Sequence, residues 1–137
     1  MSASEPLSAN WLERARSAVN ADPAFRKRGT IDVKMGVKID KSTYLVTFSG
    51  FSCHGVAKMN EHDLRDADFI VDMTADQWTR FLDGRRTGKG RSLVELDTTD
   101  GVIKASNPRK TMDFLRYHTS IQAFFDAGVR AETSQVA

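Results

Sequence analysis

The stretch from Ile31 to Ile39 reads Ile-Asp-Val-Lys-Met-Gly-Val-Lys-Ile, with an apolar residue at every odd position. Successive side chains of a β-strand point to opposite faces of a sheet. The strict alternation therefore predicts a strand with one buried and one solvent-facing side. This is the clearest strand in the chain, and the neighbouring segments are assigned around it.

Two further strands are predicted directly after this one. The run from Thr43 to Gly50 puts Tyr44, Val46 and Phe48 on one face, and a weaker pattern continues from Phe51 to Met59. The turns between these segments are short. Three consecutive strands joined in this way predict an antiparallel meander.

Two more strands, at residues 67–73 and 102–105, complete the predicted sheet. The segment from Ser92 to Asp100 fits either a short helix or a strand. The prediction is a single α+β domain over residues 1–137, with a five-stranded sheet covered by helices. The sheet consists of the three-strand antiparallel meander plus two further strands. Residues 1–7 and 130–137 are expected to be flexible tails.

Three helices are predicted to cover the sheet. Asn10 with Glu13, and Thr74 with Gln77, have the spacing of a capping box, and Gly84 is placed to end the second helix. Proline and glycine positions bound the other two helices. The first helix is predicted to begin near Ser8 or Asn10 and to end at about residue 22, and the other two to cover about 74–84 and 108–128.

Composition narrows the class of protein. The chain has 137 residues, a formal net charge of +2 and a single cysteine, Cys53. An internal disulfide is excluded, and one unpaired thiol fits a reducing compartment. The sequence shows neither a signal peptide nor an apolar run of the ~20 residues that a membrane helix needs. We therefore expect a soluble, cytoplasmic protein without a nucleic-acid partner.

Residues suited to catalysis are few. Cys53 and His54 are neighbours on a predicted strand, so their side chains should point to opposite faces and cannot form a nucleophile–base pair. His62 and His118, the other two histidines, have no metal-ligand spacing. The sequence predicts no catalytic residue, no metal and no cofactor.

The segment from Gly84 to Arg91 is rich in glycine and arginine. It fails as a Walker A loop because it has three residues, not four, before Gly88-Lys89, and Gly90 replaces the hydroxyl residue. Two interpretations stay open. The segment is a solvated loop, or its four cations make transient contact with a membrane surface or a partner enzyme.

Aromatic residues suggest a binding site. The chain has eight phenylalanines, two tryptophans and two tyrosines, and the last helix carries more apolar width than one buried stripe absorbs. This predicts an apolar cavity of ~300–1,000 Å³ beneath the helices. Tyr44, Tyr117 and His118 are candidate polar contacts to the ligand. The predicted lining residues are Phe48, Val71, Trp78, Phe81, Met112, Leu115 and Phe125.

Three segments carry a family resemblance: Asp22-Pro23-Ala24-Phe25, residues 67–84 with their strand, capped helix and glycine, and Gly101-Val102-Ile103-Lys104-Ala105. In this order they resemble the sterol carrier protein type-2 family of lipid-transfer domains, over about residues 8–128. The resemblance implies a tunnel for sterols, fatty acyl chains or similar lipids between sheet and helices, with no metal or cofactor. Residues 84–100 depart from the family pattern. The last residues, Ser134-Gln135-Val136-Ala137, do not resemble Ser-Lys-Leu, so we do not expect a peroxisomal address.

Two alternatives to a carrier stay open. One is a small α+β isomerase or dehydratase in which His118 pairs with an aspartate such as Asp72. The other is an interaction module or homodimer that packs its aromatic surface against a partner. For the carrier itself, both a monomer and a homodimer fit the sequence.

Overall fold

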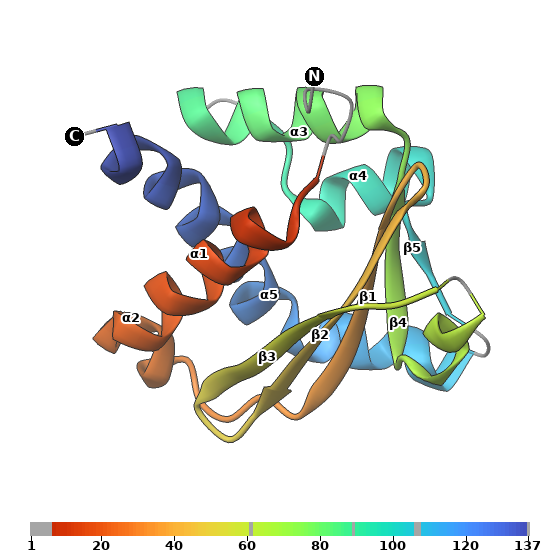
Figure 1. Cartoon of the computed structure of the whole chain (residues 1–137). Coiled ribbons are helices and arrows are strands. Elements are labelled where there is room, and N and C mark those ends of the chain that lie inside the picture. Colours follow the sequence, from red (N-terminus) through yellow and green to blue (C-terminus); the bar gives the residue numbers. More distant parts are fainter. Residues whose placement is uncertain (1–6, 61, 89, 106–107, 137) are drawn as a thin grey trace.

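The computed structural model describes residues 7–60, 62–88, 90–105 and 108–136. Figure 1 shows a twisted sheet crossed by helices. Along the chain the elements are α1 (Ala9–Ala21), α2 (Pro23–Lys27), β1 (Val33–Ile39), β2 (Ser42–Ser49), β3 (Ser52–Lys58), η2 (Asp63–Asp66), β4 (Phe69–Met73), α3 (Ala75–Thr87), α4 (Leu93–Asp100), β5 (Ile103–Lys104) and α5 (Pro108–Val136).

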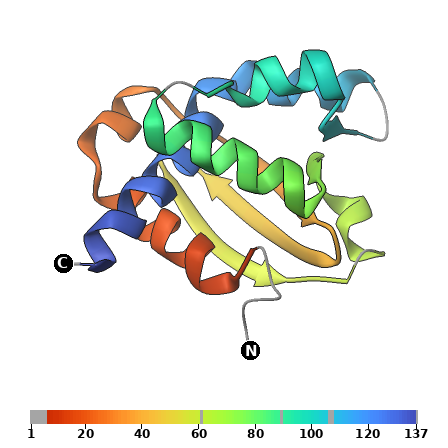
Figure 2. The same cartoon turned by 90° about the horizontal axis from the view of Figure 1, so that it is seen from above.

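The five strands lie in the order β3-β2-β1-β4-β5. β1, β2 and β3 pair as two antiparallel hairpins, β4 joins β1 in parallel, and β5 joins β4 antiparallel. α1 packs on β3 and on α5, while α5 also packs on β4. In Figure 2, α3 runs over the molecule with α1 on one side and α4 on the other. The predicted α+β class, meander and two further strands are confirmed.

β1 follows the alternation that its sequence predicts, with the odd-numbered residues from Val33 to Ile39 buried. Gly36, on the opposite face, is buried as well, because η2 and β4 cover it. A Cβ at Gly36 would lie 3.0 Å from Ile70 and 3.2 Å from Leu64. The second face of the sheet is therefore only partly open to solvent.

α3 starts as predicted and ends later. Thr74 and Gln77 form the capping box, with hydrogen bonds of 2.9 and 3.1 Å. The helix continues past Gly84 to a left-handed C-cap at Gly88, whose φ is 75°. Gly84 is needed for a close approach instead, since a Cβ there would lie 2.6 Å from the Cα of Gly90. The predicted helix end at Gly84 is wrong for this reason.

The starts of two other helices are settled by their caps. Of the two predicted starts of α1, Ser8 and Asn10, Ser8 is the cap, and its hydroxyl accepts a hydrogen bond of 3.2 Å from the Trp11 backbone N–H. The ambiguous segment 92–100 contains the helix α4. Ser92 and Glu95 form its capping box, a spacing that the sequence contains but that the prediction did not use.

α5 is longer than predicted because Gly128 does not end it. The helix runs through Val136, and Gly128 lies against the indole of Trp11. Of the expected tails, residues 1–6 and 137 lie outside the described residues, Leu7 is buried, and residues 130–136 belong to α5. No helix in the described ranges has the length and hydropathy to cross a membrane.

The contact between Trp11 and Gly128 predicts that alanine, which usually stabilises a helix relative to glycine, is unfavourable at residue 128. A Cβ at residue 128 would lie 2.4 to 2.8 Å from ring atoms of Trp11. We expect Gly128→Ala to destabilise the protein by about 1–3 kcal/mol, although glycine-to-alanine in an open helix stabilises by about 1 kcal/mol. Urea unfolding measures the change. Gly55→Ala is the control, because its methyl group meets open space, and equal effects of the two variants would contradict the packing.

Candidate functional site

Seven aromatic side chains fill the space between the helices and the sheet. Their nearest ring centroids lie 5.3–6.5 Å apart, mostly in edge-to-face or tilted arrangements. They come from α1, α2, β2, α3 and α5, so the set joins elements from all parts of the chain. We call this set the aromatic cluster: Trp11, Phe25, Phe48, Trp78, Phe81, Phe124 and Phe125.

Five of the seven predicted lining residues lie in the core: Phe48, Val71, Trp78, Phe81 and Phe125. Met112 and Leu115 do not, with exposed fractions of 66% and 50%. Both belong to α5, on which the nearby Phe114 is buried and marks the side that faces the core. At about 100° per residue, Met112 and Leu115 lie about 160° and 100° around the helix from Phe114. The structure therefore places these two predicted lining residues on the surface and not beside the aromatic cluster.

The candidate polar contacts differ in their exposure. Tyr44 is buried at 3% exposure, whereas Tyr117 and His118 are half-buried on α5. Phe81, although only 3% exposed, borders both the aromatic cluster and a surface depression. Its ring lies 5.9 Å from that of Trp78, and its side chain also lines a depression between α3 and α4.

The depression between α3 and α4 has a volume of about 230 Å³. Phe81 and Leu96 supply its apolar lining, and its rim is polar. Arg80 on this rim pairs with Asp76, at 2.7 Å, and both side chains are more than two-thirds exposed. The remaining rim residues are Gln77, Arg91 and Asp100. The sequence did not indicate Leu96, because the helix α4 that places it was ambiguous, and it indicated Arg91 only as one of the cations of the basic segment 84–91.

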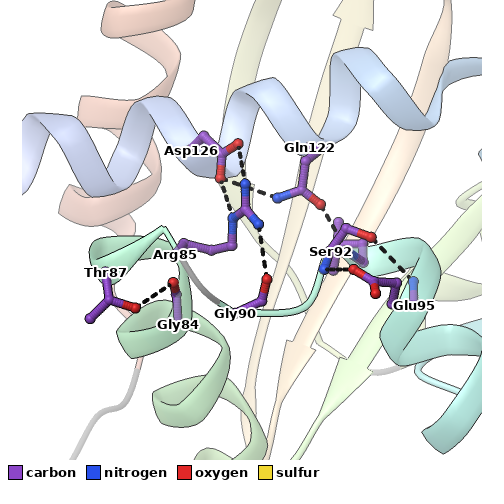
Figure 3. Close-up of polar contacts among 9 residues, drawn as sticks. Gly84, Arg85, Thr87, Gly90, Ser92, Glu95, Gln122 and Asp126 are labelled. Atoms are coloured by element: carbon purple, nitrogen blue, oxygen red, sulfur yellow. Dashed lines mark hydrogen bonds and ion pairs between the residues drawn. The ribbon is translucent and has the colours of Figure 1, made fainter.

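Polar contacts hold the connection between α3 and α4 against α5 (Figure 3). Arg85 donates two hydrogen bonds to Asp126, at 2.8 and 3.1 Å, and one of 3.4 Å to the carbonyl of Gly90. The side chain of Gln122 accepts a bond from the Leu93 N–H at 2.8 Å and donates one to Asp126 at 3.1 Å. We call Arg85, Gln122 and Asp126 the clamp. Hydrogen bonding to Asp126 raises the pKa of Arg85, so this pairing favours the charged form of Arg85.

Part of the basic segment 84–91 is bound to other parts of the chain. Arg85 is used in the fold, and Arg86 pairs with Asp83 and Glu132. Glu132 also accepts a bond of 2.7 Å from the indole N–H of Trp11. Burial acts to raise the pKa of Glu132, but the bonds from Arg86 and Trp11 outweigh it and lower the pKa. Two of the four cations thus form ion pairs within the chain, although Arg86 is 43% exposed, and surface contact by this segment stays a prediction.

Cys53 and His54 point to opposite faces of β3, as the sequence predicts, with Cys53 buried and His54 exposed. The side chain of Asn20 holds the backbone of Cys53 by two bonds, of 2.8 and 3.0 Å. Burial raises the pKa of the Cys53 thiol to about 12, despite the nearby Arg16. The thiol is therefore a core group at neutral pH and not a nucleophile.

Comparison with known proteins identifies the architecture. No family model and no curated protein matches the chain. Sterol carrier protein 2 superposes with a TM-score of 0.61 at 15% sequence identity, covering 90% of this chain and 94% of that one. The chain has the sterol carrier protein 2 fold. A conserved hypothetical protein of Thermus thermophilus, described as a candidate sterol carrier protein, gives a TM-score of 0.62 at 14% identity, over 90% of this chain and 87% of that one.

The sterol carrier protein 2 fold agrees with the resemblance that the sequence shows. Identities of 14–15% carry the fold and not individual site residues, so the chemistry depends on the side chains of this chain. The alternative enzyme would need His118 and Asp72 to meet. No hydrogen bond or ion pair joins them within the described ranges, and Asp72 borders a surface depression near Lys38 and Lys104.

The clamp should contribute measurably to stability because it is largely shielded from water. The side chains of Arg85 and Asp126 are 23% and 27% exposed. We expect Arg85→Ala to lower the free energy of unfolding by about 1 kcal/mol. Urea titration measures this loss. The matched control Arg80→Ala breaks the exposed pair with Asp76 and should change stability by no more than about 0.5 kcal/mol. Equal losses in the two variants would show that the clamp adds nothing beyond a surface ion pair.

The Cys53 thiol should be unreactive in the folded protein. With a pKa of about 12 it holds its proton at pH 8, so Ellman's reagent should react roughly a hundredfold more slowly than after unfolding in urea. Above about pH 9 the unfolded thiol ionises while the folded one does not. Stability should therefore fall by about 1 kcal/mol between pH 8 and pH 10 relative to Cys53→Ala. Rapid labelling of the native protein would contradict this burial.

Proposed function

We propose that this protein binds an apolar small molecule, such as a sterol, a fatty acyl chain or a terpenoid, and carries it without changing it chemically. The proposal depends on one observation. Phe81 lines the depression between α3 and α4 and packs in the aromatic cluster as well. An apolar molecule that binds at this depression would therefore contact a ring that is itself packed against the rings of the aromatic cluster.

The ligand needs more room than the depression offers. A volume of about 230 Å³ lies below the ~300–1,000 Å³ typical of small-molecule sites, and the rings of the cluster occupy the space where the sequence predicts the cavity. We propose that α3 and α4 move outward together when the ligand enters. The clamp attaches their connection to α5 mainly through polar side chains, which water can solvate when it opens.

Binding energy in this proposal comes from apolar area, at ~25 cal/mol per Å² before ordering costs are subtracted. The rim supplies only weak polar contacts. Arg80 is held by an exposed ion pair and can exchange it, and Arg91 donates a hydrogen bond of 3.2 Å to Thr99. Such a rim suits the polar end of an amphiphilic lipid more than a fully apolar one.

Two measurements test the proposal. Organic extraction of freshly purified protein, followed by mass spectrometry, should release an apolar compound. Both tryptophans of the chain lie in the aromatic cluster, so excitation of the protein should also transfer energy to bound cis-parinaric acid. An empty extract together with no energy transfer would overturn the carrier proposal.

A matched pair of variants tests the entrance. Leu96→Arg puts a charge at the apolar lining of the depression, and we expect it to weaken cis-parinarate binding roughly tenfold or more. Thr98→Arg puts the same charge on an exposed position of α4 and should leave binding within about twofold. Equal affinities for the two variants would place the entrance elsewhere.

A further inference from the structure

α5 exposes two large apolar side chains close together. Among the described residues, the large hydrophobic side chains that are exposed are Phe51, Met112 and Leu115, and two of these three lie on α5. Both are far around the helix from Phe114, which is buried in the core. Core packing therefore does not explain why these two positions carry apolar side chains.

The neighbours of Met112 and Leu115 on the helix surface are cationic. At about 100° per residue, Arg109, Arg116 and Thr119 fall on the same side of α5, within an arc of about 120°. All five residues are exposed. We call Arg109, Met112, Leu115, Arg116 and Thr119 the outer face of α5.

The outer face carries positive charge without a compensating carboxylate. Neither Arg109 nor Arg116 forms an ion pair within the part of the chain that the structure describes, although Asp113 is four residues from one and three from the other. Asp113 is half-buried at the edge of the face. The guanidinium of Arg116 lies 5.5 Å from the ring centroid of Tyr117, which leaves its charge uncompensated.

From this combination we infer that the outer face of α5 docks the protein on an anionic lipid surface. Helices that lie on membranes combine apolar side chains, which enter the boundary of the acyl region, with Arg or Lys side chains at the level of the headgroups. Each arginine near an anionic leaflet strengthens partitioning about fivefold. Two arginines and two apolar anchors give weak, reversible attachment.

A protein partner fits this face less well. A stable interface between proteins buries about 800 Å² on each side and uses some 20–30 residues, whereas the outer face has five residues on one helix. A bilayer needs no complementary shape, so a narrow face is sufficient. Docking does not depend on the proposed cargo, because none of the five residues belongs to the aromatic cluster.

Flotation with lipid vesicles tests the inference. The wild-type protein should float with vesicles of phosphatidylcholine and phosphatidylserine, should not float with pure phosphatidylcholine, and should be released by high salt. The double variant Met112→Ser/Leu115→Ser should partition at least roughly tenfold less. The double variant Arg109→Ala/Arg116→Ala should lose roughly tenfold or more on anionic vesicles.

Phe51→Ser is the matched control, since it removes an exposed apolar side chain from the turn between β2 and β3. It should keep partitioning within about twofold of the wild type. The inference is overturned if the wild type does not float, if Phe51→Ser matches the α5 variants, or if light scattering shows that the α5 variants dissociate a dimer. Unchanged cis-parinarate binding in these variants would separate a failure of docking from a failure of the proposed carrier function.

Discussion

The packing of Trp11 against Gly128 is the contact on which the helical layer depends. A Cβ on residue 128 would lie 2.4 Å from the indole, so α1 and α5 can approach each other only because glycine is present. The ring centroids of this indole and of Trp78 on α3 lie 5.3 Å apart, and the indole N–H donates a hydrogen bond to Glu132. One side chain thus sets the positions of three helices above the sheet, and the remaining cluster rings pack around it.

The contacts between α3, α4 and α5 are of two kinds. Aromatic rings attach α3 to the interior, and the clamp attaches the connection between α3 and α4 to α5 through Arg85 and Asp126. When the two helices move outward, an apolar ligand can take the place of the ring packing, and water can take the place of the polar bonds. In the proposed opening, ligand contacts and hydration replace the ring packing and the polar bonds, and this exchange would let a packed interior accommodate the cargo.

The sequence predicts the sheet well because a period of two is a strong, local signal, as the alternation from Ile31 to Ile39 shows. The core positions of Phe48, Trp78 and Phe81 follow from similar local patterns. The errors depend on contacts between distant residues. Gly84 and Gly128 look like helix ends, but both are present because another part of the chain lies against them, and no local pattern reveals this. Met112 and Leu115 are apolar and near helical spacing, so the sequence pattern alone did not show that they lie on the exposed side of α5.

The central claim is that an apolar ligand passes between α3 and α4 to the aromatic cluster. A crystal structure of the complex with a fatty acid or sterol tests it most directly. The account predicts ligand density against Phe81 and Trp78, with α3 and α4 displaced outward. The ring centroids of Phe81 and Phe125, now 6.0 Å apart, should then be farther apart. Rings that keep their present spacing, with the ligand bound elsewhere or absent, would contradict it.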